Sequence, residues 1–427
     1  MRALCFVVLS ACGSAPRATT PAAPLPPIAT AASAAPASPC ALANATELAD
    51  GDTGALLGSR IAAAGDVALA EWERQGTDET EGWSGAKPHF ALVDASGARQ
   101  APVSVSSAVA APNAVAAPLG GRALGSLVYG AHIDWFFSLA TFATFPESSG
   151  FFEPRGARYE PPSYVPNTME AASADGSPLL AVAITTGHDL GGKRVDDCME
   201  TATGVPPCHS QLWGAADELA VIGFPKGGAP WTRPIPLPAA ATKDTDWPLA
   251  IALDEAHGAY AFRYAGAMWL GWLGASAADV GAPTKIREGR LGAPAMAMRG
   301  GELLVVFAER DTDDAPWHLV SMRFDARHAA GPVRTLERGF APSLAATTDG
   351  FVIAWMDGDA KSTGWIRAAS WDGAGSLAAA PALTPTSGNA RDPEVAASGA
   401  RAWIVWQEFS RARRDGAVHL ASLVCPR

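Results

Sequence analysis

The sequence predicts an all-β fold made of repeated four-stranded units, and three observations carry this prediction. Four segments of the C-terminal half begin alike, with a proline at the start of a short, mostly apolar run, at Pro248, Pro294, Pro342 and Pro393. These prolines lie 46, 48 and 51 residues apart. Glycine, proline and aspartate interrupt the chain about every 8–12 residues, which leaves no room for helices of ordinary length.

The third of these repeats shows its strands in order. Residues 342–346 form a short first strand, and residues 347–350 (Thr-Thr-Asp-Gly) form a turn, because Asp-Gly tolerates a positive φ. Residues 351–355 are apolar almost without interruption, which is typical of a strand buried on both faces. Residues 365–371 give the third strand and residues 377–384 a weaker fourth strand. Tryptophans at repeat positions are expected to pack between units, namely Trp355, Trp365, Trp403 and Trp406.

The N-terminal half contains weaker copies of the same strands, which fit at residues 66–71, 89–97, 179–184 and 219–224 and fit worst at 119–141. A period of roughly 40–50 residues built from short strands is typical of propeller blades. Such units cannot bury their apolar faces alone, so they stack on one another. We therefore expect a single β-propeller of about seven blades, with six as the competing count if 119–141 forms no blade. A barrel or paired sandwiches is the alternative.

The two ends of the repeat region predict how the ring closes. The last repeat stops after its third strand, at 418–424, and residues 41–48 could supply the missing fourth strand. An open blade would otherwise leave an unpaired sheet edge. Cys40 precedes the first of these segments and Cys425 follows the second, so antiparallel pairing would place them side by side for a disulfide. Two free thiols are the alternative.

The first residues indicate export. Leu9-Ser-Ala-Cys12 follows a short apolar run and resembles the lipobox of bacterial lipoproteins, in which the cysteine is acylated after cleavage before it. The resemblance implies a signal peptide over 1–12, a lipid on Cys12, and, since Gly13 is not Asp, the outer membrane. An ordinary secretory signal is the alternative. Residues 13–39 are mostly Ala, Pro, Ser and Thr and predict a disordered tether, so the folded domain is expected over 40–427.

The remaining cysteines and the net charge of the chain argue against a metal ion and against nucleic acid as ligands. Cys198 and Cys208 are expected to form a disulfide across one loop, because an even number of cysteines in an exported chain favours disulfides. A metal site with nearby His and Asp residues is the alternative, although nine intervening residues is poor zinc spacing. No metal and no cofactor are expected. The formal net charge of −11 argues against nucleic acid.

Two groups of residues are candidates for binding. Acids align at the exit of the second strand of four repeats and could ring one mouth of a propeller: Glu71, Glu309, Asp357 and Glu408. Such acids could bind a cation or cleave a glycosidic bond, or they could simply accept hydrogen bonds in the following turn. The loop over 142–165 breaks the repeat and carries aromatic residues that could contact a ligand or pack on the sheet, among them Phe151, Phe152, Tyr159 and Tyr164.

The sequence contains no nucleophile elbow, P-loop, dinucleotide fingerprint or His-Glu-x-x-His motif, and no catalytic residue is assigned. The leading hypothesis is a non-enzymatic, lipid-anchored binding scaffold of the cell envelope that recognises a glycan, peptide or protein partner. A glycoside hydrolase or polysaccharide lyase that uses the aligned carboxylates is the second hypothesis. A purely structural part of an envelope complex is the third.

Overall fold

The computed structural model divides the chain into two units, Met1–Ala35 and Pro36–Arg427. All the residues that the structure describes lie in the second unit, at 40–48, 56–75, 86–94, 96, 114–116, 123–130, 136–143, 150–152, 165–172, 179–189, 196–198, 208–210, 214–225, 228–237, 248–358, 364–373, 377–379, 383, 389–410 and 413–425. The predicted signal peptide, Cys12 and the predicted tether lie outside these residues.

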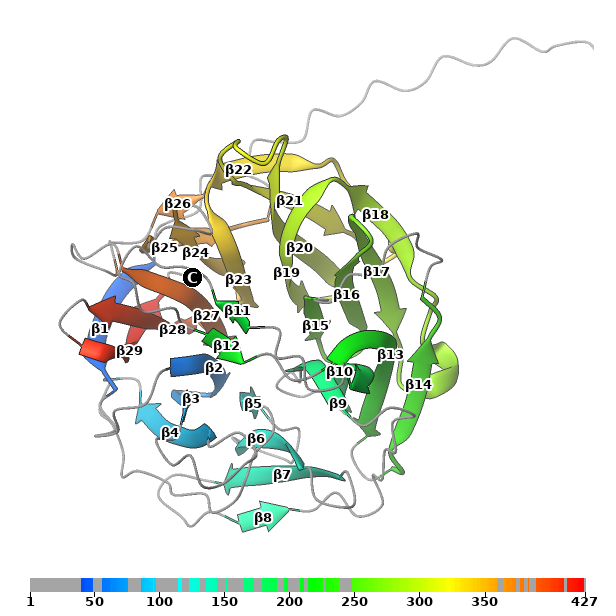
Figure 1. Cartoon of the computed structure of the whole chain (residues 1–427), viewed down its shortest axis with the longest axis horizontal. Coiled ribbons are helices and arrows are strands. Elements are labelled where there is room, and N and C mark those ends of the chain that lie inside the picture. The colour runs from blue at the N-terminus through cyan, green and yellow to red at the C-terminus, as the bar shows by residue number, and fades with distance from the viewer. Residues whose placement is uncertain are drawn as a thin grey trace, which may run out of the picture. The chain divides into compact units, whose positions relative to one another are not determined.

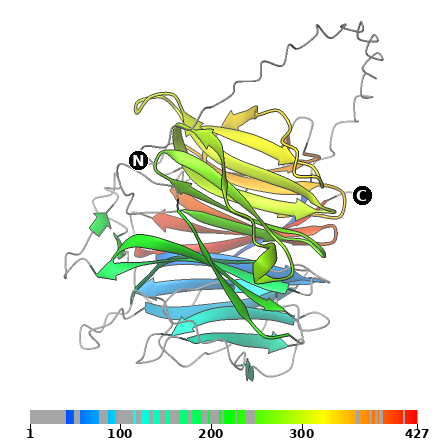
Figure 2. The same ribbon diagram turned by 90° about the vertical axis from the view of Figure 1, so that its right-hand side faces the viewer.

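The second unit is a β-propeller, in which sheets surround a central axis (Figure 1). Six sheets of four strands and one sheet of three strands form the ring in the described part of the chain. This agrees with the expected count of about seven, with six as the competitor. Figure 2 shows the strands running between two faces of the ring, with the short hairpin β11–β12 beyond the strand ends on one face.

Three consecutive sheets of the C-terminal half each use four sequential strands, ordered from the axis outward. Their strands are β15 (Leu249–Leu253), β16 (Gly258–Tyr264), β17 (Ala267–Leu273) and β18 (Thr284–Glu288); β19 (Arg290–Arg299), β20 (Glu302–Arg310), β21 (His318–Phe324) and β22 (Arg334–Arg338); and β23 (Phe340–Ala346), β24 (Phe351–Asp357), β25 (Trp365–Trp371) and β26 (Ala378–Ala379). A short 3-10 helix, η1 (Ala277–Asp279), connects β17 to β18.

The N-terminal half supplies three further sheets and the hairpin. Their strands are β2 (Leu56–Ala64), β3 (Val67–Gln75) and β4 (Ala86–Asp94); β5 (Ala114–Ala116), β6 (Ala123–Gly130), β7 (Phe136–Ala143) and β8 (Gly150–Phe152); β9 (Val165–Ala172), β10 (Leu179–Asp189), β13 (Gly214–Pro225) and β14 (Trp231–Ile235); and the hairpin strands β11 (Asp196–Cys198) and β12 (Cys208–Ser210). The stretch 119–141, which fits the repeat worst, therefore does contribute strands to a four-stranded sheet.

The sequence pattern explains the layering of each sheet. The blades narrow toward the axis, so their innermost strands carry many alanines, which leave room for seven sheets to meet. The second strands pack against neighbouring sheets on both faces, and residues 303–308 of β20 are at most 1% exposed. Burying such continuous apolar strands between sheets contributes about 25 cal/mol per Å² of apolar area removed from water.

The last sheet closes the ring in the way that the sequence predicts. It combines β27 (Ala390–Ser398), β28 (Arg401–Ser410) and β29 (Arg413–Val424) from the C-terminus with β1 (Ala41–Glu47) from the N-terminus. Strand β1 pairs antiparallel with β29, and Ala41 lies opposite Val424. Strand β29 therefore has a paired strand on each side, and β1 supplies the fourth strand that the C-terminal repeat lacks.

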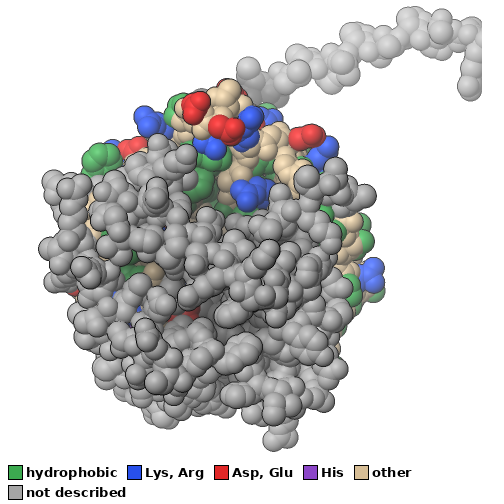
Figure 3. All heavy atoms as spheres, in the orientation of Figure 1, with side chains coloured by type: hydrophobic (Ala, Val, Ile, Leu, Met, Phe, Trp, Pro, Cys, Tyr) green, Lys and Arg blue, Asp and Glu red, His purple; other side chains and the backbone are tan. Residues whose placement is uncertain are grey.

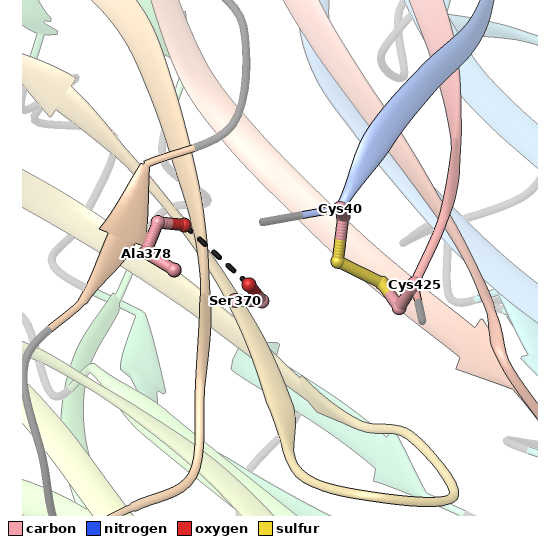
Figure 4. The surroundings of a disulfide bond; sticks show 4 residues. All are labelled: Cys40, Ser370, Ala378 and Cys425. Atoms are coloured by element: carbon pink, nitrogen blue, oxygen red, sulfur yellow. Dashed lines mark hydrogen bonds between the residues drawn. A yellow bond between two sulfur atoms is a disulfide. The ribbon is translucent and has the colours of Figure 1, made fainter. Parts of the chain in front are cut away.

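A disulfide joins the two ends of this sheet. Cys40 and Cys425 are bonded, with their Cα atoms 4.1 Å apart, although 385 residues separate them in the sequence. Figure 4 shows the bond beside the sheet that contains Ser370 and Ala378. Both cysteines are buried in the apolar cluster between these two sheets. The covalent link therefore lies where the ring closes.

The tryptophans follow the prediction with one exception. Trp355, Trp403 and Trp406 are buried between sheets. Trp365 is 45% exposed, so its predicted place in the core is wrong. It is the first residue of β25 and pairs with Asp357 at the end of β24, where the sheet meets solvent.

Candidate functional site

Three of the four predicted acids occupy equivalent positions, at or near the ends of the second strands β20, β24 and β28. Each acid contacts a basic side chain of its own sheet or of the preceding one: Arg287 with Glu309 (2.8 Å), Arg367 with Asp357 (2.9 Å) and His419 with Glu408 (3.3 Å). Arg287 bonds both oxygens of Glu309. Each of these carboxylates therefore has a basic partner of its own, in contacts that the sequence pattern does not reveal.

Glu71 does not share that position. It lies in the middle of β3, opposite Arg60 of β2, and is fully buried. Trp72 stacks on His89 as Trp406 stacks on His419, so Trp72 and Trp406 are the equivalent residues of their sheets. Two residues after each of these tryptophans stand Arg74 in β3 and Glu408 in β28, so Arg74 is the residue equivalent to Glu408. The predicted alignment of Glu71 with the other acids is therefore wrong by three residues.

The aromatic candidates fall on a strand or outside the described residues. Phe151 and Phe152 belong to β8, the last strand of its sheet, where they pair with Ala140 and Leu139 of β7. The backbone of this part of the predicted loop is thus incorporated in a sheet. Tyr159 and Tyr164 lie outside the described residues, and a binding role for all four remains a prediction.

The hairpin β11–β12 places Cys198 directly opposite Cys208. This backbone register is compatible with the predicted disulfide, which remains a prediction. In the described part of the chain, no three His, Cys, Asp or Glu residues gather as they would around a metal ion. Among the same residues, no helix has the length and apolar character needed to cross a membrane.

A funnel of about 640 Å³ opens along the axis of the propeller. Its walls are the C-terminal ends of the innermost strands, and they are almost entirely aliphatic: 61–63 of β2, 171–172 of β9, 251–253 of β15, 296–298 of β19, 344–346 of β23 and 395–397 of β27. Charged and polar residues of the first hairpins surround its mouth: Asp254, Glu255, His257, Arg299 and Ser398. The hairpin β11–β12 belongs to the connection from β10 to β13, which lies at the opposite face (Figure 2).

The carboxylate of Asp254 connects two neighbouring turns at the rim of the funnel. Asp254 accepts hydrogen bonds from the backbone N–H groups of Ala256 and His257 in its own turn. It also accepts one from Gly301 in the corresponding turn of the next sheet, at 2.6 Å. Burial alone would raise the pKa of Asp254, but these three donors outweigh burial and hold the pKa below its usual value. The mouth of the funnel is therefore stabilised by an ionised aspartate.

A charged cluster crosses the axis at the narrow end of the funnel. Arg60 of β2 donates to Glu170 of β9 at 2.8 Å and to Glu394 of β27 at 3.0 Å. Ser343 of β23 donates to the second oxygen of Glu394 at 3.1 Å and accepts the N–H of Val395 at 2.9 Å. Each of these four side chains comes one residue before the wall residues of its strand. The cluster, which we call the axial cluster, therefore lies one residue beyond the innermost wall residues, a level that we call the floor of the funnel.

Backbone bulges set the position of two members of the axial cluster. The register of β27 with β28 shifts between Arg391 and Glu394, and Asp392 within the shift has φ of 50°. The register of β23 with β24 shifts between Phe340 and Ser343, and Ala341 has φ of 46°. A bulge bends its strand and re-aims the side chains that follow. The repeat prolines come directly after these two residues, so Ser343 and Glu394 are placed by the repeat itself.

The charges of the axial cluster influence one another. Burial raises the pKa of Glu394 to about 7, although Arg60 lowers it and Glu170 and Asp392 add to the rise. Burial also raises the pKa of Glu170 against the opposing effect of Arg60. The charge of Glu170 in turn raises the pKa of Arg60. Glu170 and Glu394 keep 26% and 33% of their side-chain surface accessible.

Sequence reasoning missed the axial cluster, although one signal was available. The residue after each repeat proline is Leu249, Ala295, Ser343 or Glu394. Two repeats have an apolar residue at this position of the innermost strand, whereas the other two have a serine and a glutamate. Polar residues at a position that is otherwise apolar were the available signal. Arg60 and Glu170 occur in the weaker N-terminal copies, so their equivalence to this position is visible only in the structure.

The acidic and basic side chains on the face opposite the funnel are interspersed over β20–β22 (Figure 3). Asp313, for example, lies between Arg290 and Arg310. Such mixed surfaces produce no strong field of one sign, so this part of the surface offers no electrostatic patch for a charged partner.

Comparisons with known proteins leave the function open. No protein-family model and no curated protein matches the sequence. Solved structures that resemble the fold include the polysaccharide lyase Uly1 (9% identity, TM-score 0.49, 89% of this chain and 92% of that one) and the α-L-arabinofuranosidase Arb93A from Fusarium graminearum (10%, 0.45, 89% and 97%). A third is the Pyrococcus horikoshii acylaminoacyl peptidase (8%, 0.45), for which the match covers 85% of this chain but only about half, 52%, of the peptidase. Identities and TM-scores at this level carry no argument about activity or substrate.

Proposed function

We propose that this chain is a non-enzymatic binding scaffold that takes an extended segment of a peptide or protein partner into its axial funnel. The observation that carries the proposal is a cavity with aliphatic walls and a charged floor, whose described walls come from the innermost strands of six sheets. Concave sites with mostly apolar walls and a few convergent polar groups are the usual form of ligand sites. The closed ring supports binding without large rearrangement of the walls.

The composition of the walls favours a peptide over a glycan. The described wall residues include no Phe, Tyr or Trp, which are the residues that stack against sugar rings. Alanine, leucine, isoleucine, valine and methionine suit the small apolar side chains and the methylene groups of a peptide. The innermost strands also turn one backbone edge toward the axis, where an extended segment could accept or donate main-chain hydrogen bonds.

The location that we propose is the cell envelope. The support is the lipobox-like Leu9-Ser-Ala-Cys12 and the Ala/Pro-rich residues 13–39, which precede a domain closed by a disulfide. Disulfides persist in oxidising compartments. Incorporation of a labelled fatty acid into the full chain, and its loss in Cys12→Ser, would support an anchor at this cysteine. Export of an unlabelled wild-type chain would instead favour an ordinary secretory signal.

The binding proposal is tested by calorimetry on the full chain with short peptides and envelope oligosaccharides as probes. We expect peptides to bind and oligosaccharides not to bind. Ala346→Trp places an indole at the funnel wall and is expected to abolish peptide binding. Ala379→Trp is the matched control, because Ala379 is exposed on the short outer strand β26. Equal loss in both variants, or no peptide binding to wild type, would contradict the proposal.

Glycan cleavage is the second candidate, and one observation favours it. Glu170 and Glu394 both have raised pKa values and both contact the same arginine at the end of a cavity. A carboxylic acid that stays protonated near neutral pH can act as a general acid beside a second carboxylate. Release of reducing ends from an envelope polysaccharide by wild type, abolished in Glu394→Gln and in Glu170→Gln, would favour this candidate over binding alone.

A further inference from the structure

We propose that the group of the ligand that reaches the floor of the funnel is a primary ammonium, carried at the leading end of an extended aliphatic or peptide chain, and that it binds between Glu170 and Glu394. This inference rests on the proposed function, because it concerns the occupant of the same funnel. It adds the chemical class of the group that the axial cluster recognises.

The charge balance of the axial cluster favours a cation at the floor. The axial cluster holds one guanidinium and two carboxylates, Arg60 with Glu170 and Glu394. Asp392 and Glu71 add negative charge close to Arg60, and Arg391 pairs with Asp392 at 3.3 Å from outside the cluster. With both glutamates ionised, the cluster therefore carries one uncompensated negative charge. A cation at the floor would compensate it.

One carboxylate oxygen of the axial cluster is left open as an acceptor by the described residues. Glu394 uses one oxygen for Arg60 and the other for Ser343. Glu170 uses one oxygen for Arg60, and its second oxygen accepts no hydrogen bond from any residue that the structure describes. A carboxylate accepts several hydrogen bonds when ionised. The second oxygen of Glu170 is thus an acceptor available to an ammonium group at the floor.

The depth and the walls of the funnel favour the end of a chain as the occupant. Gly399 at the mouth follows Glu394 by five residues, and at ~3.3 Å per residue the floor lies roughly 16 Å below the rim. The walls at this depth are aliphatic, with Ile61, Leu344 and Val395 next to the cluster. Methylene groups bind such walls while the charged end continues to the carboxylates. A side chain presented at the rim is too short for this depth, so the end of a chain must enter.

The test uses three acetylated and amidated tetrapeptides, Ala-Ala-Ala followed by lysine, norleucine or glutamate, titrated into the full chain at pH 8. Norleucine keeps the methylene stem and lacks the ammonium. We expect the lysine peptide to bind roughly 10- to 100-fold more tightly than the norleucine peptide, which is the range for a hydrogen bond to a charged group. The glutamate peptide should bind least, because its charge repels both carboxylates.

Two variants separate the floor from the rest of the protein. In Glu394→Gln the preference for lysine over norleucine should fall to within about threefold, since hydrogen bonds to a neutral amide are weaker. Glu337→Gln removes the same charge from the exposed outer strand β22 and should keep the full preference. The preference is a ratio within one variant, so a modest loss of stability does not change it.

The outcomes distinguish the two proposals. Binding of all three peptides with equal affinity, or an undiminished lysine preference in Glu394→Gln, would overturn the ammonium site and leave the binding scaffold intact. A stronger affinity for the glutamate peptide would show that the arginine, and not the carboxylates, selects the ligand. Failure of every peptide to bind wild type would overturn the proposed function and the ammonium site together.

Discussion

Arg60 and Glu170 are 110 residues apart and form an ion pair of 2.8 Å across the axis of the propeller. They belong to β2 and β9, and the sheet β5–β8 lies between their two sheets in the ring (Figure 1). The same arginine bonds Glu394 of the sheet on its other side, at 3.0 Å. One side chain therefore links three sheets where the two ends of the repeat region meet.

Removing this arginine should destabilise the ring. Arg60→Met leaves Glu170 and Glu394 facing each other without a cation, and the loss of one partner of a part-buried pair is expected to cost about 1–3 kcal/mol at pH 8. Urea denaturation followed by tryptophan fluorescence measures this change. Arg367→Met is the matched control, because it breaks the more exposed pair with Asp357 and should cost less than about 1 kcal/mol. Equal costs for the two variants would contradict a bracing role for Arg60.

Glu394 should make stability depend on pH near neutrality. Its pKa is about 7 in the folded protein, whereas the unfolded chain releases this proton near its ordinary value of about 4.3. Between these values the folded state binds more protons, so the contribution of Glu394 to stability falls as the pH rises. The stability of Glu394→Gln relative to wild type should therefore increase from pH 5 to pH 8. Thermal unfolding at several pH values checks this, and Glu337→Gln should show no such trend.

The propeller could be predicted from the sequence, whereas the axial cluster could not, because only the propeller depends on local signals. Strand periodicity and turn residues are local, so β25 begins and ends at its predicted residues, and β1 takes its predicted place beside β29. The contacts of Arg60 depend on which strands meet at the axis and on the register of each. Glu71 was aligned three residues away from its true equivalents, because a single weak copy of the repeat does not fix the register of β3.

The closing disulfide should contribute measurably to stability. In a Cys198→Ser, Cys208→Ser background, reductant can act only on Cys40 and Cys425 among the cysteines of the folded domain. The chain-entropy model gives about 6 kcal/mol as an upper limit for so long a loop. We expect a reducing agent to lower the Tm of this background by several degrees. An unchanged Tm, with the loss of the bond confirmed by thiol labelling, would contradict the role of the disulfide in closing the ring.

The bulge before Ser343 should carry backbone strain. Ala341 has φ of 46°, a region in which a residue with a Cβ is disfavoured by roughly 1–2 kcal/mol. Ala341→Gly removes this strain but adds entropy to the unfolded chain, so we expect a net gain of up to about 1 kcal/mol. Ala345→Gly, in the same strand with no positive φ, should instead lose about 0.5–1 kcal/mol. Chemical denaturation of the two variants should thus give changes of opposite sign.

Asp254 should support the funnel mouth only while it is ionised. Asp254→Ala removes the acceptor for two N–H groups of its own turn and for Gly301 of the next sheet, with an expected cost of about 1–3 kcal/mol at pH 7. Because its pKa is lowered in the folded state, this contribution is complete above the unfolded pKa and is lost as the pH falls through the folded one. The difference in Tm between wild type and variant should therefore shrink from pH 6 toward pH 3. Asp314→Ala, at an exposed position in the loop after β20, should change little at either pH. A difference that stays constant with pH would mean that the carboxylate charge plays no part in joining the two turns.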